Sequence, residues 1–282
     1  MSILEHRREL INTHVFVVGP NNSGTTLMKT LLARSRHSWS LEREGQFAFG
    51  YKGPVSAKTM IPLEGDSQEP IVMEPLTWAA CDTSIQRIRD RRRYDWKASK
   101  KAWYLTASSS NPASATVFVE KTPAFLLIVE QLIESFEGCR FIFMARNPYA
   151  TVEGIVRRRN HKNFLNSPEI DLTERAALHV LNCLRVQKRN IEIFTKQACF
   201  ISYEKLCDDP QGTLKCLSDL VPELNDLDLY AHFGVKGEQA SPVNNRNEQQ
   251  IHALSLKQRL VISSVFKPEQ ELLSWFGYEL YD

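Results

Sequence analysis

The chain has 282 residues, of which 43% are hydrophobic, and its formal net charge is +2. This length is enough to bury a full core and fits one large domain, residues 1–282, better than two. No segment reaches the roughly 20 apolar residues that a membrane-spanning helix needs, and the amino terminus lacks the apolar stretch of a signal peptide. We therefore exclude a membrane span and expect a soluble, cytoplasmic protein.

Short β-branched or aromatic runs alternate with longer helical patterns along the chain. Strands are predicted at residues 14–19, 116–120, 139–145 and 198–203. Helices are predicted at residues 25–33, 123–135, 148–158, 172–195, 210–220 and 254–275. Strands that are apolar on both faces and alternate with helices of about ten or more residues indicate a parallel sheet covered on both sides. We therefore predict a three-layer α/β fold.

Two segments have a weaker pattern. Residues 46–111 contain Gly, Pro and Ser followed by a charged helical stretch, and we interpret them as an insertion that covers the carboxyl edge of the sheet and shapes an acceptor pocket. Residues 160–171 are a second irregular segment and a candidate lid. Basic runs at residues 87–93 and 157–162 face either an acidic ligand or water, and a solvated helix face is the commoner case.

The cysteines and histidines indicate neither a disulfide framework nor a metal site. None of the six cysteines belongs to a CxxC pair, and Cys139 and Cys199 stand beside apolar runs, so we expect free thiols in a reducing compartment. The seven histidines show no HExxH or similar ligand spacing, so no metal is expected.

The segment VFVVGPNNSGTTLMKTLL, residues 15–32, runs from a strand through a glycine-containing loop into a helix. The loop at residues 19–24 and the first helical turn at Thr25 and Thr26 present backbone N–H groups and the positive end of a helix dipole to one point, which favours an anion. Thr25 stands where the GxxxxGK[ST] phosphate loop has its lysine, which argues against a nucleotide triphosphatase.

The SGTT of this loop resembles the 5′-phosphosulfate loop of the sulfotransferases that use 3′-phosphoadenylyl sulfate (PAPS), including tyrosylprotein and heparan sulfate sulfotransferases and their bacterial relatives. The resemblance implies a P-loop-like fold in which the donor's phosphate is held by Asn22, Ser23, Gly24, Thr25 and Thr26. Asn22 departs from the family, which usually has Lys or Arg at this place. An amide carries no charge, and charge-assisted hydrogen bonds are roughly twice as strong as neutral ones.

The EKTP of residues 120–123 follows a predicted strand and resembles the heparan sulfate O-sulfotransferases, whose lysine at this place faces the sulfuryl and acceptor site. Ligands of open α/β sheets bind at the carboxyl ends of the strands. Lys121 is therefore our candidate for the cation that Asn22 does not provide. The alternative is that Glu120 and Lys121 form an edge pair that caps a helix.

Two later segments continue the resemblance in the family's order. The RNP of residues 146–148 resembles the signature that grips the 3′-phosphate, and Arg146 suits this contact because a guanidinium donates two parallel bonds to a phosphate. Gly154 replaces the usual serine of this signature, and Arg157 or Arg158 is a candidate to compensate. Tyr203 takes the place of a tyrosine that lies beside the nucleotide, although an isolated tyrosine at a strand end usually serves packing.

Sulfuryl transfer requires the acceptor oxygen, the sulfur and the leaving oxygen to lie roughly in line, and it needs a base for the acceptor's proton. Related sulfotransferases carry a glutamate beyond the first helix, where this chain has Glu42 and Glu44. We prefer Glu44 for its EGQF context, and the alternative is a pair of exposed loop carboxylates. His14, which opens a strand, and His37, which follows the helix, are weaker candidates.

The motifs together predict a sulfotransferase that moves a sulfuryl group from PAPS, its co-substrate, to a hydroxyl or amine acceptor in a carbohydrate, small metabolite or protein. An anionic glycan and a small hydroxyl compound are both candidate acceptors, and no nucleic-acid partner is expected. A catalytically impaired nucleotide-binding member of the same fold is an alternative, favoured by Asn22 and Gly154. A P-loop kinase is a further alternative, disfavoured by Thr25.

Overall fold

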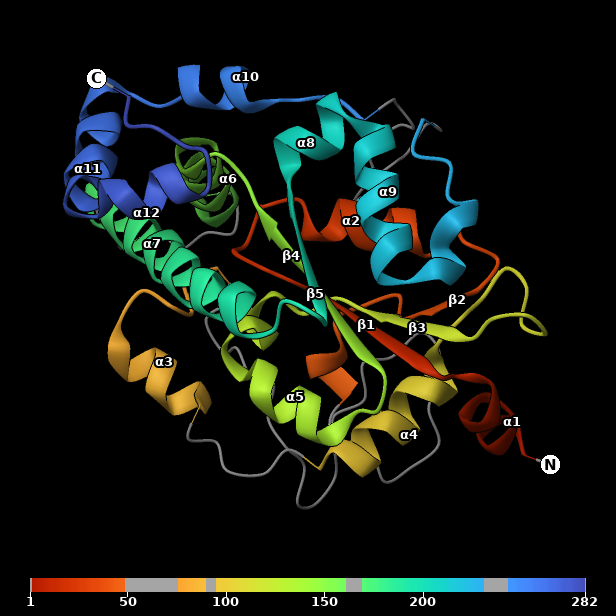
Figure 1. Cartoon of the computed structure of the whole chain (residues 1–282). Coiled ribbons are helices and arrows are strands. Elements are labelled where there is room, and N and C mark those ends of the chain that lie inside the picture. The colour runs from red at the N-terminus through yellow and green to blue at the C-terminus, as the bar shows by residue number, and fades with distance from the viewer. Residues whose placement is uncertain (1, 49–75, 90–94, 161–168, 231–242, 282) are drawn as a thin grey trace.

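The computed structural model describes residues 2–48, 76–89, 95–160, 169–230 and 243–281. Within them, five parallel strands form one sheet in the order β2-β3-β1-β4-β5 (Figure 1). The strands are β1 (Thr13–Val18), β2 (Ser38–Ser40), β3 (Val117–Glu120), β4 (Cys139–Ala145) and β5 (Ala198–Ser202). The chain passes from β1 to one edge of the sheet, returns to β3 and then crosses to β4 on the other side of β1. Such a reversal of strand order is where ligands of open α/β sheets bind, outside the carboxyl ends of the strands.

Both faces of the sheet are apolar, because side chains alternate between the faces along each strand. Val15 and Val17 of β1 belong to one core cluster, and Phe16 and Val18 belong to another. The first face packs against α2 (Thr25–Leu32), α8 (Tyr203–Asp208), α9 (Pro210–Leu220) and the 3-10 helix η3 (Pro222–Asp226). The second packs against α3 (Asp82–Arg89), α4 (Trp96–Thr106), η2 (Pro123–Ile128), α5 (Val129–Ser135) and α7 (Glu169–Ile193). The two helical layers lie on opposite sides of the sheet in Figure 1, which confirms the predicted three-layer fold.

A third core cluster lies beside β4 and β5 and brings the carboxyl-terminal helices to the sheet (Figure 1). In it α6 (Pro148–Asn160) packs on α7 and α10 (Asn247–His252), while α7 packs on α11 (Leu256–Phe266). The chain then continues through η4 (Lys267–Glu269) and α12 (Gln270–Trp275). Two other elements contact α4, namely α1 (Ile3–Leu10) and η1 (Gly45–Ala48). This arrangement places α10 next to α6, where it reaches the site described below.

The predicted strand at residues 139–145 and helix at residues 210–220 are confirmed at both ends. The prediction of one continuous α-helix is wrong for two segments. Residues 123–135 begin as the 3-10 helix η2, and residues 254–275 divide into α11, η4 and α12 around Pro268, which has no N–H for a helical hydrogen bond. Strand β2 went unpredicted because Ser38–Ser40 contains no apolar run.

The predicted insertion at residues 46–111 is described only in part, since residues 49–75 and 90–94 lie outside the described residues. Its helices α3 and α4 pack Ile85 and Trp103 into the core on the second face of the sheet. That the insertion shapes an acceptor site stays a prediction. Most of the candidate lid at residues 160–171 and parts of both basic runs also lie outside the described residues.

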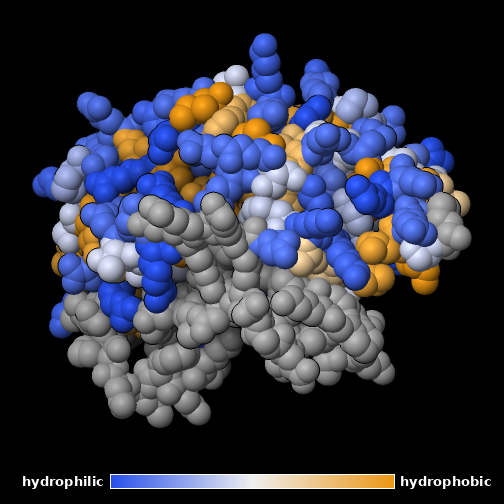
Figure 2. Space-filling model, turned by 90° about the horizontal axis from the view of Figure 1, so that it is seen from below, coloured by the Kyte–Doolittle hydropathy of each residue, from blue (hydrophilic) through white to orange (hydrophobic). Residues whose placement is uncertain are grey.

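The described surface seen from below the view of Figure 1 is mostly hydrophilic, with apolar side chains in patches between hydrophilic ones (Figure 2). None of the described helices combines the length and the apolar character needed to cross a lipid bilayer.

Candidate active site

The loop between β1 and α2 turns around two glycines with positive φ, Gly19 at 148° and Gly24 at 95°. A Cβ on Gly19 would collide with the carbonyl oxygen of Met144 in β4, so only glycine fits there. Gly24 is the N-cap of α2, and no side chain caps this helix. The first N–H groups of a helix have no intrahelical partner. The N–H groups of Thr25 and Thr26 can therefore bind an anion at the positive end of the helix dipole.

The side chains of Ser23 and Asn22 in this loop make contacts with other residues of the protein. The buried Ser23 hydroxyl donates to the carbonyl oxygen of Pro20 at 2.7 Å and so holds the turn. Asn22 has a φ of 66°, which asparagine adopts more readily than most residues. Its side chain lies against Gly154 of α6, because a Cβ on Gly154 would come 3.2 Å from Asn22 Cγ. The two departures from the family pattern thus lie against each other, and Asn22 Nδ2 is buried without a hydrogen-bond partner in the described structure.

Arg146 follows β4 and is only 8% exposed. Its Nε donates to Asn247 Oδ1 at 2.7 Å, and its Nη2 donates to Gln250 Oε1, so α10 fixes the guanidinium. The guanidinium carbon lies 4.1 Å from the centre of the Tyr203 ring, in a cation–π contact. Burial lowers the pKa of Arg146, but a guanidinium stays charged in proteins. Two of its N–H groups are used, which leaves others for a phosphate.

Tyr203 connects the loop with Arg146. A Cβ on Gly24 would lie 3.2 Å from the Tyr203 ring, and the Tyr203 hydroxyl donates to the carbonyl oxygen of Asn244 at 2.6 Å. Burial raises the pKa of Tyr203 to about 12, so the hydroxyl remains a donor at neutral pH. The structure therefore brings the loop, Arg146 and Tyr203 together at the carboxyl ends of β1, β4 and β5.

Glu204 is a positioning residue that the sequence alone did not indicate. Its Oε1 accepts bonds from the backbone N–H of Asn147 at 2.7 Å and from Asn247 Nδ2 at 2.6 Å, and its Oε2 accepts from the Tyr278 hydroxyl at 3.1 Å. Asn247 in turn accepts from Arg146. One carboxylate thus joins the RNP turn, α10 and the carboxyl-terminal segment. The only local signal was an acidic residue directly after the strand-end tyrosine.

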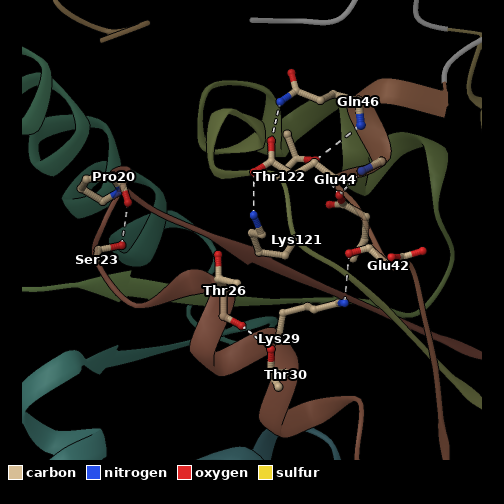
Figure 3. Close-up of polar contacts among 12 residues, drawn as sticks. Pro20, Ser23, Thr26, Lys29, Thr30, Glu42, Glu44, Gln46, Lys121 and Thr122 are labelled. Atoms are coloured by element: carbon tan, nitrogen blue, oxygen red, sulfur yellow. Dashed lines mark hydrogen bonds and ion pairs between the residues drawn. The ribbon is translucent and has the colours of Figure 1, made fainter. Parts of the chain in front are cut away.

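Lys121 and Glu44 face each other at the carboxyl end of β3 (Figure 3). Lys121 Nζ lies 2.5 Å from Glu44 Oε1, and Glu44 Oε2 accepts a bond from Gln46 Nε2 at 2.5 Å. The side chains of Lys121 and Glu44 are 12% and 24% exposed, so the pair is largely shielded from water. The alternative that Glu120 and Lys121 form an edge pair is wrong, because Glu120 is fully buried and Lys121 pairs with the candidate base.

Glu120, the last residue of β3, fixes the turn that carries Glu44. Its Oε1 accepts bonds from the backbone N–H of Gly45 at 2.7 Å and from the Thr122 hydroxyl at 2.5 Å. Its Oε2 is buried with no hydrogen-bond partner in the described part of the chain. Burial raises the pKa of Glu120 to about 7, although the bonds from Thr122 and Gly45 act in the opposite direction.

A cavity of about 660 Å³ lies between the loop, α2 and the turn that carries Glu44. Thr25, Thr26, Glu44 and Lys121 all line it. Its walls also include Glu42 and Lys29, which approach each other in Figure 3. Arg146 and Tyr203 lie outside this lining, where the loop meets α6 and α10. The site thus has two parts that the loop joins: a cavity with the lysine–carboxylate pair, and a buried arginine beside a tyrosine.

The weaker candidates lie elsewhere. His14 stands near the amino end of β1, opposite the loop, and its Nε2 is 2.7 Å from the Tyr104 hydroxyl. His37 contacts the carbonyl oxygen of Ser114 and does not line the cavity. All six cysteines are free. Among the residues that the structure describes, no three His, Cys, Asp or Glu side chains are grouped to hold a metal ion.

The family model described as the Sulfotransferase family matches residues 14–221. The chain belongs to the Sulfotransferase family. The matched region contains the loop, Lys121, Arg146 and Tyr203, and it confirms the family predicted from the sequence. A search of curated proteins found no match.

Solved structures resemble this chain in their fold. The chain is similar to sulfotransferase STF9 from Mycobacterium avium, with 13% identity over 98% of this chain and 80% of that chain and a TM-score of 0.55. It is also similar to the sulfotransferase domain of the olefin synthase from Synechococcus PCC 7002, with 18% identity over 96% of both chains and a TM-score of 0.52. At these identities the likeness shows the fold alone, which is the P-loop-like sulfotransferase fold.

Proposed function

We propose that this sulfotransferase moves a sulfuryl group from PAPS to a hydroxyl or amine acceptor in a carbohydrate, small metabolite or protein. The observation that carries the proposal is the two-part site around one anion-binding loop. A buried arginine stands beside a tyrosine on one side, and Lys121 pairs with Glu44 in a cavity on the other. A nucleotide with phosphates at both ends of its ribose fits such an arrangement.

The chain's own residues suit the donor. The N–H groups of Thr25 and Thr26 would hold the 5′-phosphate, where negative charge develops as the sulfuryl group leaves. Arg146 would donate its remaining N–H groups to the 3′-phosphate, and α10 and Glu204 already hold it in place. Fixed donors of this kind need no reorganisation during the reaction.

The cavity side of the site would activate the acceptor. The acceptor's oxygen or nitrogen forms a bond to sulfur while the bond between sulfur and the phosphate oxygen breaks. Glu44 takes the proton that the acceptor loses, and such a base contributes a rate factor of about 100 to 10,000. Lys121 holds the Glu44 carboxylate and places a positive charge beside the transferred group.

Calorimetric titration with 3′,5′-adenosine bisphosphate, the desulfated product of PAPS, tests the donor site, with ATP as the control nucleotide. We expect the wild type to bind the bisphosphate, and Arg146→Ala to bind it about 10- to 100-fold more weakly, because hydrogen bonds to charged groups contribute about 1.5 to 3 kcal/mol. Arg185→Ala is the matched control, since its side chain is 49% exposed and pairs on the surface with Glu269. A wild type that does not bind the bisphosphate would overturn the proposal.

The contact between Asn22 and Gly154 favours a second candidate function, a nucleotide-binding member of the family without turnover. Consumption of PAPS in the presence of mixed hydroxyl and amine acceptors distinguishes the two. Bisphosphate binding without PAPS consumption would support a nucleotide-binding protein without turnover. PAPS consumption by the wild type that is lost in Glu44→Gln would support the sulfotransferase.

A further inference from the structure

The loop of this chain has no cation of its own. Position 22, where related sulfotransferases carry Lys or Arg, holds an asparagine whose side chain lies against Gly154 of α6. The cavity side of the loop therefore needs another positive charge if a phosphate is to be neutralised there. Lys121 supplies one, but its ammonium is already paired with Glu44 at 2.5 Å.

Lys29 stands one turn after Thr25 on α2, and residues four apart share one face of a helix. The Lys29 side chain extends from α2 toward the backbone of Glu42 (Figure 3). Lys29 lines the same cavity as Thr25, Thr26 and Lys121. Lys29 therefore lines the cavity that the loop and the first turn of α2 also line.

The surroundings of Lys29 compensate its charge only in part. Its Nζ makes one long hydrogen bond, 3.5 Å to the backbone carbonyl oxygen of Glu42, and no ion pair with any described carboxylate. Burial, and then the charge of Lys121, lower the pKa of Lys29, and Glu42 and Glu120 only partly oppose this. Two ammonium groups that repel each other in one partly buried cavity favour an anion that both can contact.

We propose that Lys29 supplies the positive charge that neutralises the 5′-phosphate of the donor, in place of the missing cation at position 22. This inference rests on the proposed function and adds a donor-binding residue to it. Arg146 would then recognise one phosphate, and Lys29 together with the first turn of α2 would recognise the other. The contributions of the two phosphates to binding can be measured separately, because nucleotides that carry only one of the two phosphates exist.

The test compares the binding of 3′,5′-adenosine bisphosphate with that of adenosine 3′-monophosphate, which lacks the 5′-phosphate. Calorimetric titrations use the wild type, Lys29→Met and Lys29→Arg, with Lys215→Met as the matched control, since the Lys215 side chain on α9 is 76% exposed. We expect Lys29→Met to weaken binding of the bisphosphate about 10- to 100-fold and to leave binding of the monophosphate unchanged. Lys29→Arg should retain most of the bisphosphate affinity, because the charge is kept.

The outcomes separate this inference from the proposed function. If the wild-type protein bound neither nucleotide, both the role of Lys29 and the proposed function would be overturned. Tight bisphosphate binding in the wild type, with the same affinity in Lys29→Met, would overturn the role of Lys29 and leave the proposed function standing. If Lys29→Met weakened the binding of both nucleotides equally, the role of Lys29 would also be overturned, because a structural effect of the substitution would then explain the result.

Discussion

Glu120 is a carboxyl group that water does not reach, at the end of the strand that carries Lys121. It accepts bonds from Gly45 and Thr122 and thereby fixes the turn in which Glu44 lies. A charged carboxylate is disfavoured in such surroundings, and the pKa of Glu120 is raised from 4.5 to about 7. The protonation state of a residue that supports the candidate base therefore changes near neutral pH.

The raised pKa of Glu120 predicts a pH-dependent stability. Between pH values near 4.5 and near 7, the folded chain holds a proton on Glu120 that the unfolded chain has lost, so the free energy of unfolding falls as pH rises. Glu120→Gln keeps an acceptor oxygen for Gly45 and Thr122 but cannot titrate. Relative to the wild type, we expect this variant to gain on the order of 1 to 3 kcal/mol between about pH 5 and about pH 8, measured by urea unfolding. The same difference at both pH values would contradict the assignment.

At the scale of elements, the contact of the β1–α2 loop with α6 links the two departures from the family pattern. Gly154 lies inside α6, where glycine costs roughly 1 kcal/mol relative to alanine. The absent side chain leaves room for Asn22, since a Cβ there would lie 3.2 Å from Asn22 Cγ and 3.3 Å from Gln250 Nε2. The loop and the helix therefore constrain each other's residues.

This contact predicts a coupling between the two positions. Gly154→Ala should destabilise the protein despite the better helix propensity of alanine, because the new methyl group crowds Asn22. Asn22→Gly removes the crowding side chain at a position whose φ of 66° suits glycine. We expect a coupling free energy of about 0.5 to 3 kcal/mol in a double-mutant cycle of urea unfolding, since residues in contact are rarely additive. Additive effects of the two substitutions would show that the contact has no energetic consequence.

The features that could be predicted from the sequence are those that depend on a local pattern of residues. Apolar runs located the strand at residues 139–145, and the parallel arrangement explains why motifs after β1, β4 and β5 come together. The partners of Arg146 could not be predicted, because Asn247 and Gln250 reach it from α10 through tertiary packing. Lys29 resembles any lysine on an amphipathic helix until the cavity beside it is known.

At the scale of the whole molecule, two histidines are buried without charge in different parts of the core. His14 packs at the amino end of β1 against Tyr104 and Phe136, and His179 of α7 accepts a bond from the backbone N–H of Ala79 at 3.0 Å. Burial, assisted by the charge of Lys100, lowers the pKa of His14 to about 4, and burial lowers that of His179 to about 3. Both groups must take up a proton when the chain unfolds in mild acid.

These histidines predict that the protein loses stability as pH falls. Below the ordinary histidine pKa of 6.5 the unfolded chain binds two protons that the folded chain excludes, whereas Glu120 acts in the opposite sense with one proton. Each proton changes the free energy of unfolding by about 1.4 kcal/mol per pH unit, so the histidines outweigh Glu120.

The double variant His14→Gln and His179→Gln removes both titrations, and glutamine at position 179 retains an acceptor for Ala79. Urea unfolding between about pH 6 and about pH 5 should show a slope smaller than that of the wild type by up to about 2.7 kcal/mol per pH unit. Because the comparison uses slopes, any constant cost of the substitutions cancels, and an unchanged slope would mean that the two histidines are not neutral in the folded protein.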